Sequence, residues 1–217
     1  GKSEMKAFIF DLDGVIVFTD KFHYQAWKKM ADRMGIYFDE TINNRLRGVS
    51  RAESLEIILE RYEGEPLGEE KKAELMEEKN NTYRELLATM TPADVSDEVR
   101  ETLKKLRESG YALAIGSSSK NAKFILEKVG LLEAFDAVSD GNNITRSKPD
   151  PEVFTKAGEF LGTEPAECVV VEDAYAGIDA AKAAGMTAVG IGDAASYEKA
   201  DYRIDTFDEL QDIAGSR

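Results

Sequence analysis

Residues 8–15 have the sequence FIFDLDGV, so that Asp11 and Asp13 directly follow a short apolar run. The apolar run at residues 7–10 is typical of a buried strand in a parallel sheet. Ligands of open α/β sheets bind at the carboxyl ends of such strands, which is where both aspartates lie. Side chains two positions apart on an extended chain point the same way, and Gly14 lets the backbone turn immediately afterwards. The stretch predicts an α/β sheet with paired carboxylates at its reactive edge; two solvated acids before a turn are the alternative.

The composition restricts the classes of function. The chain has 217 residues, enough for one domain, or a domain with a smaller insert, and for a substantial core. Its 42 acidic and 28 basic side chains give a formal net charge of -14, which opposes nonspecific attraction to nucleic acid or anionic membranes. No apolar stretch reaches the roughly eighteen residues of a membrane span, and the first residues lack an apolar signal region. We expect a cytoplasmic monomer without nucleic-acid or membrane partners.

The single cysteine, Cys168, has no second cysteine with which to form an internal disulfide. It precedes the apolar run at residues 169–171, which favours a buried structural thiol over a nucleophile. A reducing, intracellular environment follows as the default expectation.

The periodicity of apolar residues divides the chain into three parts. A strand is expected at about residues 6–11, a mostly helical and charged region at about 20–90, and alternating strands and helices thereafter. The later strands are expected at 112–116, 137–139, 168–172 and 188–192, and the later helices at 97–109, 122–129, 151–161 and 176–184. Repeated strand, helix, strand units favour a parallel sheet with right-handed crossovers. The chain is therefore expected to form an α/β core that carries an all-helical insert.

A serine-rich run lies between the second expected strand and the following helix. It consists of Ser117, Ser118, Ser119, Lys120 and Asn121. A helix N-terminus has unpaired N–H donors and a dipole that favours negative charge, so this run is a candidate phosphate site. The alternative is a set of serines that only starts the helix.

Two further sets of charged residues lie where the site is expected, one in a loop and one at the end of a strand. Lys148 directly precedes Pro149 and lies near Pro151, two prolines that fix the local backbone, and Pro151 is expected to open the next helix. Glu172 ends the expected strand at 168–172 and Asp173 follows it, and consecutive acids at a strand end are a candidate site for a hard divalent cation. A solvated surface lysine and an exposed pair of acids are the respective alternatives.

All of these groups are expected to converge at one edge of a parallel sheet. Together they predict magnesium-assisted phosphoryl transfer through a covalent aspartyl-phosphate. In such chemistry a carboxylate attacks in line, Mg²⁺ and lysine neutralise the phosphoryl oxygens, and hydroxyl and amide groups hold them.

The motifs Asp11-Leu12-Asp13-Gly14, Ser117, Lys148 with Pro149, and Glu172-Asp173, in this order, resemble those of the haloacid dehalogenase (HAD) superfamily. The resemblance implies a Rossmann-like (HAD-type) parallel sheet core with an inserted all-helical cap domain of the C1 type. The core would comprise residues 1–19 and 92–217, and the cap residues 20–91. In that superfamily such a cap closes over the site and excludes water.

A finer resemblance, along nearly all of the chain, is to the β-phosphoglucomutase family. It rests on Thr19, His23, Trp27, the segment Arg47-Gly48-Val49-Ser50-Arg51, Lys79-Asn80 and the serine-rich run. It implies that Asp11 is the nucleophile and that Asp13 is the general acid and base. Thr19, His23 and Lys79 would position Asp13 once the cap closes. Arg47 departs from the family pattern, in which lysine is common, and so changes the hydrogen-bond geometry there.

The same resemblance assigns ligands to residues. Mg²⁺ would be held by Asp11, the backbone carbonyl of Asp13 and Asp173, with Glu172 in or next to the coordination shell. Ser117 and Lys148 would hold the transferring phosphoryl group. Arg51, Ser119, Lys120 and Asn121 would bind the non-reacting phosphate of the sugar. The substrate-binding set is completed by Gly48, Val49, Ser50, Asn80, Ser118 and Trp27, of which Trp27 is expected to pack within the cap rather than to stack on sugar.

The resemblance implies a magnesium-dependent phosphotransferase and isomerase. It would interconvert β-D-glucose 1-phosphate and glucose 6-phosphate through β-glucose 1,6-bisphosphate, which also primes the reaction. One alternative keeps the fold and the covalent intermediate but ends in hydrolysis, as in a sugar-phosphate phosphatase. A more distant alternative is a nonenzymatic regulatory protein in which the strand-end acids hold a structural Mg²⁺.

Overall fold

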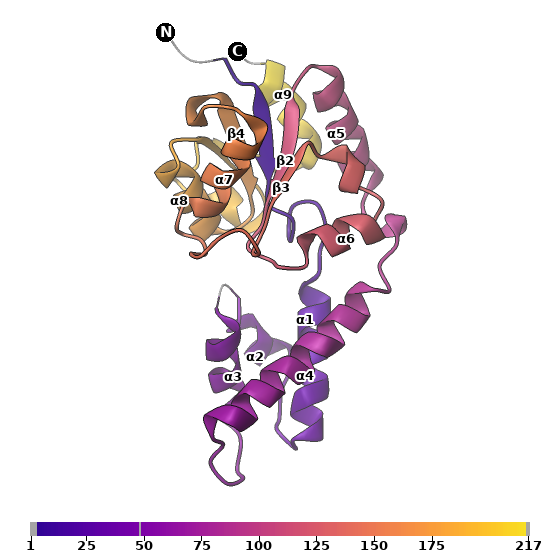
Figure 1. Ribbon diagram of the computed structural model, residues 1–217, viewed down its shortest axis with the longest axis vertical. Coiled ribbons are helices and arrows are strands. Elements are labelled where there is room, and N and C mark those ends of the chain that lie inside the picture. The colour runs from indigo at the N-terminus through magenta and orange to yellow at the C-terminus, as the bar shows by residue number, and fades with distance from the viewer. Residues whose placement is uncertain (1–3, 48, 216–217) are drawn as a thin grey trace. The chain divides into compact units, whose positions relative to one another are not determined.

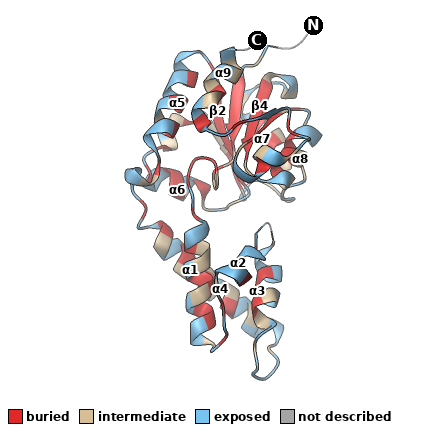
Figure 2. Ribbon diagram, turned by 180° about the vertical axis from the view of Figure 1, so that it is seen from behind, coloured by how far each residue is buried: buried red, intermediate tan, exposed pale blue. Residues whose placement is uncertain are grey.

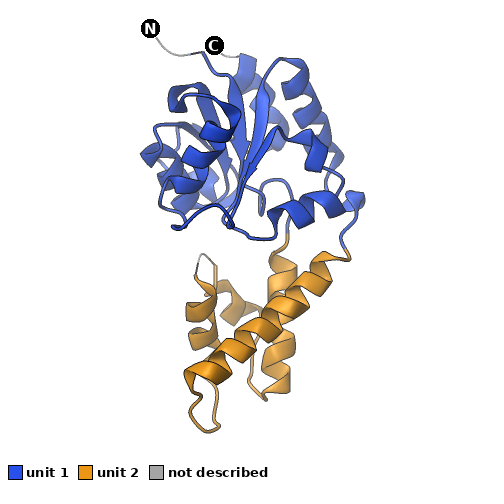
Figure 3. Ribbon diagram, in the orientation of Figure 1, with its two compact units in different colours: residues 1–18, 90–217 blue, residues 19–89 orange. Residues whose placement is uncertain are grey.

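The computed structural model describes residues 4–47 and 49–215 and divides into two compact units (Figure 3). The larger unit comprises Gly1–Phe18 and Met90–Arg217, and the smaller unit comprises Thr19–Thr89. The assignment of the smaller unit as a cap domain stays a prediction, and the two units are described separately.

The described residues of the larger unit form a six-stranded parallel sheet with the order β3-β2-β1-β4-β5-β6 (Figure 1). The strands are β1 (Ala7–Phe10), β2 (Ala112–Gly116), β3 (Ala137–Ser139), β4 (Cys168–Glu172), β5 (Thr187–Gly190) and β6 (Tyr202–Arg203). Phe10 at the end of β1 lies opposite Ile115 of β2 and Val171 of β4, so the carboxyl ends of these three strands are adjacent. The expected α/β class with a parallel sheet is confirmed.

Helices cover both faces of this sheet (Figure 1). The helices are α5 (Asp97–Glu108), α6 (Ala122–Lys128), α7 (Glu152–Leu161), α8 (Tyr175–Ala183) and α9 (Leu210–Gly215). Short 3-10 helices lie in the connecting segments at η1 (Pro92–Asp94), η2 (Leu132–Ala134), η3 (Pro165–Glu167), η4 (Gly192–Ser196) and η5 (Phe207–Glu209). Figure 2 shows that the strands are the most deeply buried part of this unit.

Strand β1 is apolar throughout because both of its faces are covered. Ala7 and Ile9 belong to the core formed with α7 and α8. The Phe8 and Phe10 rings point to the other layer, where Phe8 packs edge-on against Tyr111 and Phe10 lies 5.7 Å from the Phe207 ring centroid. Full burial on two sides explains why this short run carries no polar alternation.

Two elements near the carboxyl end, β6 and α9, were not expected from the sequence. Strand β6 has only two residues, both exposed, so apolar periodicity gives no signal for it. The expected strand at 188–192 ends earlier, at Gly190, because Gly192 has a φ of +59° and begins η4. The other expected strands and helices of this unit are present, with ends displaced by one residue at most.

Cys168 is buried in β4, as expected for a structural thiol. Its Sγ atom lies 3.2 Å from Thr163 Oγ1, and burial raises the pKa of the thiol. A raised pKa keeps the sulfur protonated and poorly nucleophilic.

Among the described residues of the smaller unit, the regular secondary structure is all helical: α1 (Asp20–Arg33), α2 (Glu40–Asn44), α3 (Arg51–Leu59) and α4 (Glu69–Leu87). Its core combines Trp27 and Met30 of α1 with Leu55 and Ile58 of α3 and Leu75 of α4. Side-chain oxygens of Asp39 and Ser50 accept backbone N–H groups at the starts of α2 and α3, which fixes where these helices begin. No described helix is both long enough and apolar enough to cross a membrane.

Candidate active site

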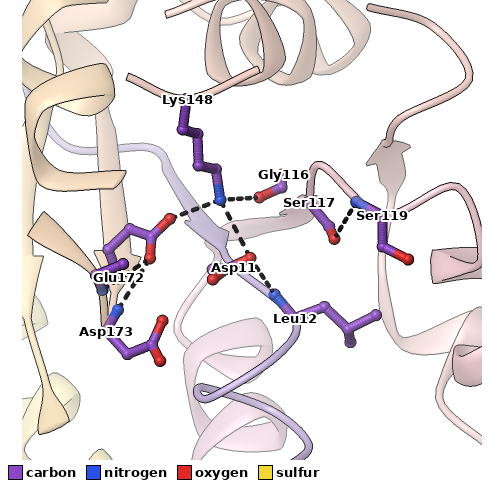
Figure 4. A network of polar contacts seen from close by, with 9 residues as sticks. Asp11, Leu12, Gly116, Ser117, Ser119, Lys148, Glu172 and Asp173 are labelled. Carbon is purple, nitrogen blue, oxygen red and sulfur yellow. Dashed lines mark hydrogen bonds and ion pairs between the residues drawn. The ribbon is translucent and has the colours of Figure 1, made fainter. Parts of the chain in front are cut away.

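Three carboxylates gather where β1 and β4 end (Figure 4). The pairing of Phe10 with Val171 brings the next residues, Asp11 and Glu172, to the same edge, and the Asp11 N–H donates to the Val171 carbonyl at 3.0 Å. One carboxylate oxygen each from Asp11, Glu172 and Asp173 lies within 4.8 Å of the others. Such a set of hard oxygen donors fits Mg²⁺.

Lys148 places a cation against this cluster. Its Nζ atom lies 2.6 Å from Glu172 Oε2, 3.1 Å from Asp11 Oδ1 and 3.2 Å from the Gly116 carbonyl oxygen (Figure 4). Burial disfavours the ammonium, but the Asp11 and Glu172 carboxylates outweigh it and raise the pKa of Lys148 above its ordinary value. Lys148 is therefore a fixed, permanently charged group and not a solvated surface lysine.

The two acids at the end of β4 differ in their surroundings. Glu172 is fully buried, and its Oε1 accepts the N–H groups of Asp173 and Ala174 while its Oε2 accepts from Lys148. Burial, followed by repulsion from Asp11, raises the pKa of Glu172, and Lys148 opposes the rise. Burial and Asp11 raise the pKa of Asp173 to about 7. Crowded carboxylates with raised pKa values are a favourable place for a divalent cation, which relieves their repulsion.

Two glycines allow these acids to sit where they do. Gly14 has a φ of +85°, and a Cβ atom there would collide with the carboxylate of Asp173. A Cβ atom at Gly177, in the first turns of α8, would collide with the carboxylate of Glu172. The sequence analysis did not single out Gly177; the signal was the run of small residues after the acid pair.

The serine-rich run forms the loop from β2 to α6. The pairing of β1 with β2 brings Ser117, which is buried, to the same edge as Asp11 (Figure 4). Ser117 Oγ accepts the Ser119 N–H at 3.1 Å, and Ser119 Oγ accepts the Asn121 N–H at 3.0 Å. The serines thus shape the start of α6; their expected role in binding phosphate stays a prediction.

A second turn, which the sequence analysis did not single out, braces this loop. The Ser117 N–H donates to the Ser139 carbonyl at 3.0 Å, and the Gly141 N–H donates to the Ser119 carbonyl at 3.0 Å. The available signal was the sequence Asp-Gly-Asn-Asn at residues 140–143, a strong turn former after an expected strand. The contact of this turn with the serine-rich loop could not be predicted, because local sequence does not indicate that β3 pairs with β2.

In the smaller unit, the buried Lys79 pairs with the half-buried His23. Lys79 Nζ lies 2.8 Å from His23 Nδ1. The same atom lies over two aromatic rings, 5.0 Å from the ring centroid of Trp27 and 4.8 Å from that of Tyr83. The His23 ring also stacks on Tyr83, with centroids 4.0 Å apart. Burial and then the charges of Lys79 and Arg51 lower the pKa of His23 to about 3, and burial and Arg51 lower that of Lys79 to about 7. The sequence analysis did not single out Tyr83.

The other candidate residues of this unit are distributed as follows. Thr19 is buried and precedes α1, and Trp27 is buried in the unit's core. Arg51 Nη2 donates to Asn80 Oδ1 at 3.4 Å, which joins the last residues of two sequence motifs. Ser50 caps α3, Val49 is half-buried, Arg47 is exposed and Gly48 lies outside the described residues.

The structure therefore collects the candidate residues into two groups, one within each unit. The larger unit brings together Asp11, Ser117, Lys148, Glu172 and Asp173. Asp13 is half-buried on the turn that follows Asp11, and its backbone forms an isolated β-bridge with Val17. Lys120 and Ser118 are exposed on the serine-rich loop, and Ser119 and Asn121 are half-buried there.

A parallel α/β sheet with acids, lysine and serine at the ends of its central strands defines a class of enzymes that act on phosphoryl groups. The model of the haloacid dehalogenase-like hydrolases matches residues 5–185, and the chain belongs to this family.

Individual relatives narrow the comparison. The chain is 43% identical over 189 residues to the β-phosphoglucomutase of Bacillus subtilis, covering 87% of this chain and 84% of that protein. It is 32% identical over 184 residues to a phosphorylated carbohydrates phosphatase of Thermotoga maritima, covering 84% and 82%. The crystal structure of a β-phosphoglucomutase from Clostridium difficile matches with a TM-score of 0.82 and 36% identity over 97% of each chain. The protein is therefore an enzyme homologous to β-phosphoglucomutase, and the resemblance inferred from the motifs is confirmed.

Proposed function

We propose that this enzyme interconverts β-D-glucose 1-phosphate and glucose 6-phosphate through β-glucose 1,6-bisphosphate. The observation that carries the proposal is the pair formed by Lys79 and His23. Asn80, the residue after Lys79, accepts a hydrogen bond from Arg51. Hydrolysis of a phosphoryl enzyme needs only water, whereas a mutase needs groups that bind a sugar phosphate and make proton transfer depend on its presence. The 43% identity to a β-phosphoglucomutase supports this assignment.

In the proposed reaction Asp11 is the nucleophile. Its Oδ1 atom accepts the Leu12 N–H at 2.8 Å and forms an ion pair with Lys148. Together these two contacts hold the carboxylate in one orientation. Attack of an Asp11 oxygen on phosphorus forms the aspartyl-phosphate as the bond from phosphorus to the sugar oxygen breaks. Asp13 gives a proton to that leaving oxygen, and later removes one from the sugar hydroxyl that takes the phosphoryl group back.

Charge at the phosphoryl group is balanced by residues of the same sheet edge. Lys148 and Ser117 would hold the phosphoryl oxygens, with Lys148 in its charged form. When bound by Asp11, the Asp13 carbonyl and Asp173, with Glu172 next to the coordination shell, Mg²⁺ supplies positive charge that stabilises the phosphoryl oxygens.

A mutase must bind two phosphates, because its intermediate is a bisphosphate that turns around between the two transfers. Arg51, Ser119, Lys120 and Asn121 would bind the phosphate that is not transferred. We further propose that the smaller unit acts as the cap and that His23, Lys79 and Thr19 bring Asp13 into position only when sugar is bound.

A sugar-phosphate phosphatase is the second candidate, because the relative from Thermotoga maritima is a phosphatase. The two activities share Asp11 and the covalent intermediate and differ only in whether sugar or water takes the phosphoryl group.

The deciding experiment follows two products at once. Purified protein is incubated with Mg²⁺, β-glucose 1-phosphate and a trace of glucose 1,6-bisphosphate, and glucose 6-phosphate and free phosphate are measured separately, with the α-anomer in parallel. Rapid formation of glucose 6-phosphate from the β-anomer alone supports the mutase. Predominant release of phosphate assigns the phosphatase, and an Asp11→Asn variant should lose either activity.

A further inference from the structure

The turn after β3, residues 139–143, contacts the serine-rich loop, residues 117–121, backbone against backbone. The Gly141 N–H donates to the Ser119 carbonyl at 3.0 Å, and Asn142 Nδ2 donates to the Lys120 carbonyl at 3.0 Å. A Cβ atom at Gly141 would collide with the Ser118 carbonyl oxygen, so the two segments are in direct contact. The pairing of β3 with β2 holds them side by side.

The turn is itself held in one conformation by its own side chains. Asp140 is buried, and its Oδ1 atom accepts the Asn142 N–H at 2.8 Å. The Asp140 N–H donates to Asn143 Oδ1 at 2.9 Å, and Asn143 Nδ2 donates to Ser139 Oγ at 3.0 Å. Such Asx contacts pre-organise a turn, so the exposed Asn142 side chain projects from a fixed base.

These contacts orient the N–H groups of the serine-rich loop. A peptide group is planar and trans, so its C=O and N–H point in opposite directions. Holding the Ser119 and Lys120 carbonyls toward the turn therefore fixes the directions of the Lys120 and Asn121 N–H groups, and the Asn121 N–H is thereby held toward Ser119 Oγ, to which it donates at 3.0 Å. Under the proposed function, these are residues that bind the phosphate that is not transferred.

We propose that Asn142 is a positioning residue for this phosphate site, acting through the Lys120 carbonyl. The inference rests on the proposed function of the serine-rich loop. A small phosphoryl donor such as acetyl phosphate has no second phosphate, so its reaction with Asp11 should not depend on Asn142. Binding of glucose 6-phosphate should depend on it.

The test compares Asn142→Ala with Asn142→Gln, which keeps the amide donor, and with Asn44→Ala, a matched change of an exposed asparagine at the end of α2. Each protein is titrated with glucose 6-phosphate while the amide resonances of Lys120 and Asn121 are followed by NMR. We expect Asn142→Ala to weaken affinity, and to raise KM for the sugar phosphate, by about two- to tenfold, the usual effect of one lost hydrogen bond. The rate with acetyl phosphate should be unchanged, and Asn142→Gln should recover part of the affinity.

Three results would overturn the inference: unchanged affinity in Asn142→Ala, an equal loss in Asn44→Ala, or no shift of the Lys120 and Asn121 amides when glucose 6-phosphate is added to the unmodified protein. Failure of the proposed function has a different signature. If the unmodified protein binds glucose 6-phosphate at these amides but does not convert β-glucose 1-phosphate, the mutase assignment is wrong. The affinity of Asn142→Ala for glucose 6-phosphate would then still decide the role of Asn142.

Discussion

At the scale of single residues, Lys148 pairs with two acids of the site, Asp11 and Glu172. Glu172 is fully buried, and Lys148 at 2.6 Å is its cationic partner. Removing one member of a buried pair leaves an uncompensated charge, which costs far more than a surface ion pair contributes. The pair therefore has a structural role that is separate from its proposed part in phosphoryl transfer.

We expect Lys148→Met to lower the free energy of unfolding by about 3 kcal/mol near neutral pH, because Glu172 then lacks its cation. The pKa of Glu172 is raised in the folded state, so protonated Glu172 favours folding below its ordinary pKa, and this contribution is lost as pH rises through the raised value. The deficit should therefore shrink as pH falls, as measured by urea unfolding. A Lys148→Met, Glu172→Gln double variant should regain part of the loss; a deficit independent of pH would contradict this account.

The only histidine gives a second prediction at this scale. Because Lys79 Nζ lies at His23 Nδ1, we expect His23 to be neutral, with its proton on Nε2. Its pKa of about 3 lies below the ordinary 6.5, so the unfolded chain binds the extra proton between these values. His23 should therefore cost stability progressively as pH falls from 6.5 toward 3. ¹⁵N NMR of the ring measures the tautomer and the titration directly, with Lys79→Met as the control; a midpoint near 6.5 would refute the neutral pair.

At the scale of elements, helix α8 contains Gly177, at a position where helix propensity alone favours another residue. Alanine is favoured over glycine inside a helix by about 1 kcal/mol. At Gly177, however, the added Cβ would collide with the Glu172 carboxylate. We expect Gly177→Ala to lower the free energy of unfolding by about 2 kcal/mol, within the usual range for overpacking, and to reduce turnover by displacing Glu172 from Lys148.

The matched control for that prediction is Gly158→Ala in α7. Its added Cβ would meet Met186 Cε at 3.2 Å, the end of a flexible side chain that can move aside. We expect its stability, measured by the same urea titration, to be unchanged or slightly higher. Equal losses in both variants would show that helix glycines, and not the contact with Glu172, set the effect.

At the scale of the whole molecule, the acidic cluster should couple folding to metal. Without metal, the pKa of Asp173 is raised to about 7, so Asp173 favours folding below its ordinary 3.8, and this contribution is lost as pH rises through about 7. Mg²⁺ binds the ionised carboxylates and stabilises the folded state by mass action. We expect Mg²⁺ to raise Tm more at pH 8 than at pH 6, as measured by thermal unfolding. The Asp173→Asn variant should lose most of this response; an equal response would place the metal elsewhere.

The larger group of site residues was largely predictable because its members lie at strand ends or in a proline-containing loop, which local sequence marks. Asp11 follows an apolar run, Glu172 closes another, and Lys148 precedes two prolines in a loop. The bracing turn at 139–143, Gly177 and Tyr83 were not predicted. Their roles come from contacts with segments distant in sequence, and no local pattern encodes those neighbours.

By itself the sequence determined the α/β class, the positions of most strands and helices, and the family, because apolar periodicity and ordered motifs are local properties. The tertiary structure alone decided which groups meet. The order β3-β2-β1-β4 puts Ser117, Asp11 and Glu172 on adjacent strand ends and sets the turn of Asn142 against the serine-rich loop. Burial then changes the chemistry of those groups, since the pKa values of Lys148, Asp173 and Lys79 depend on desolvation and on charges from other elements, which a linear sequence does not contain.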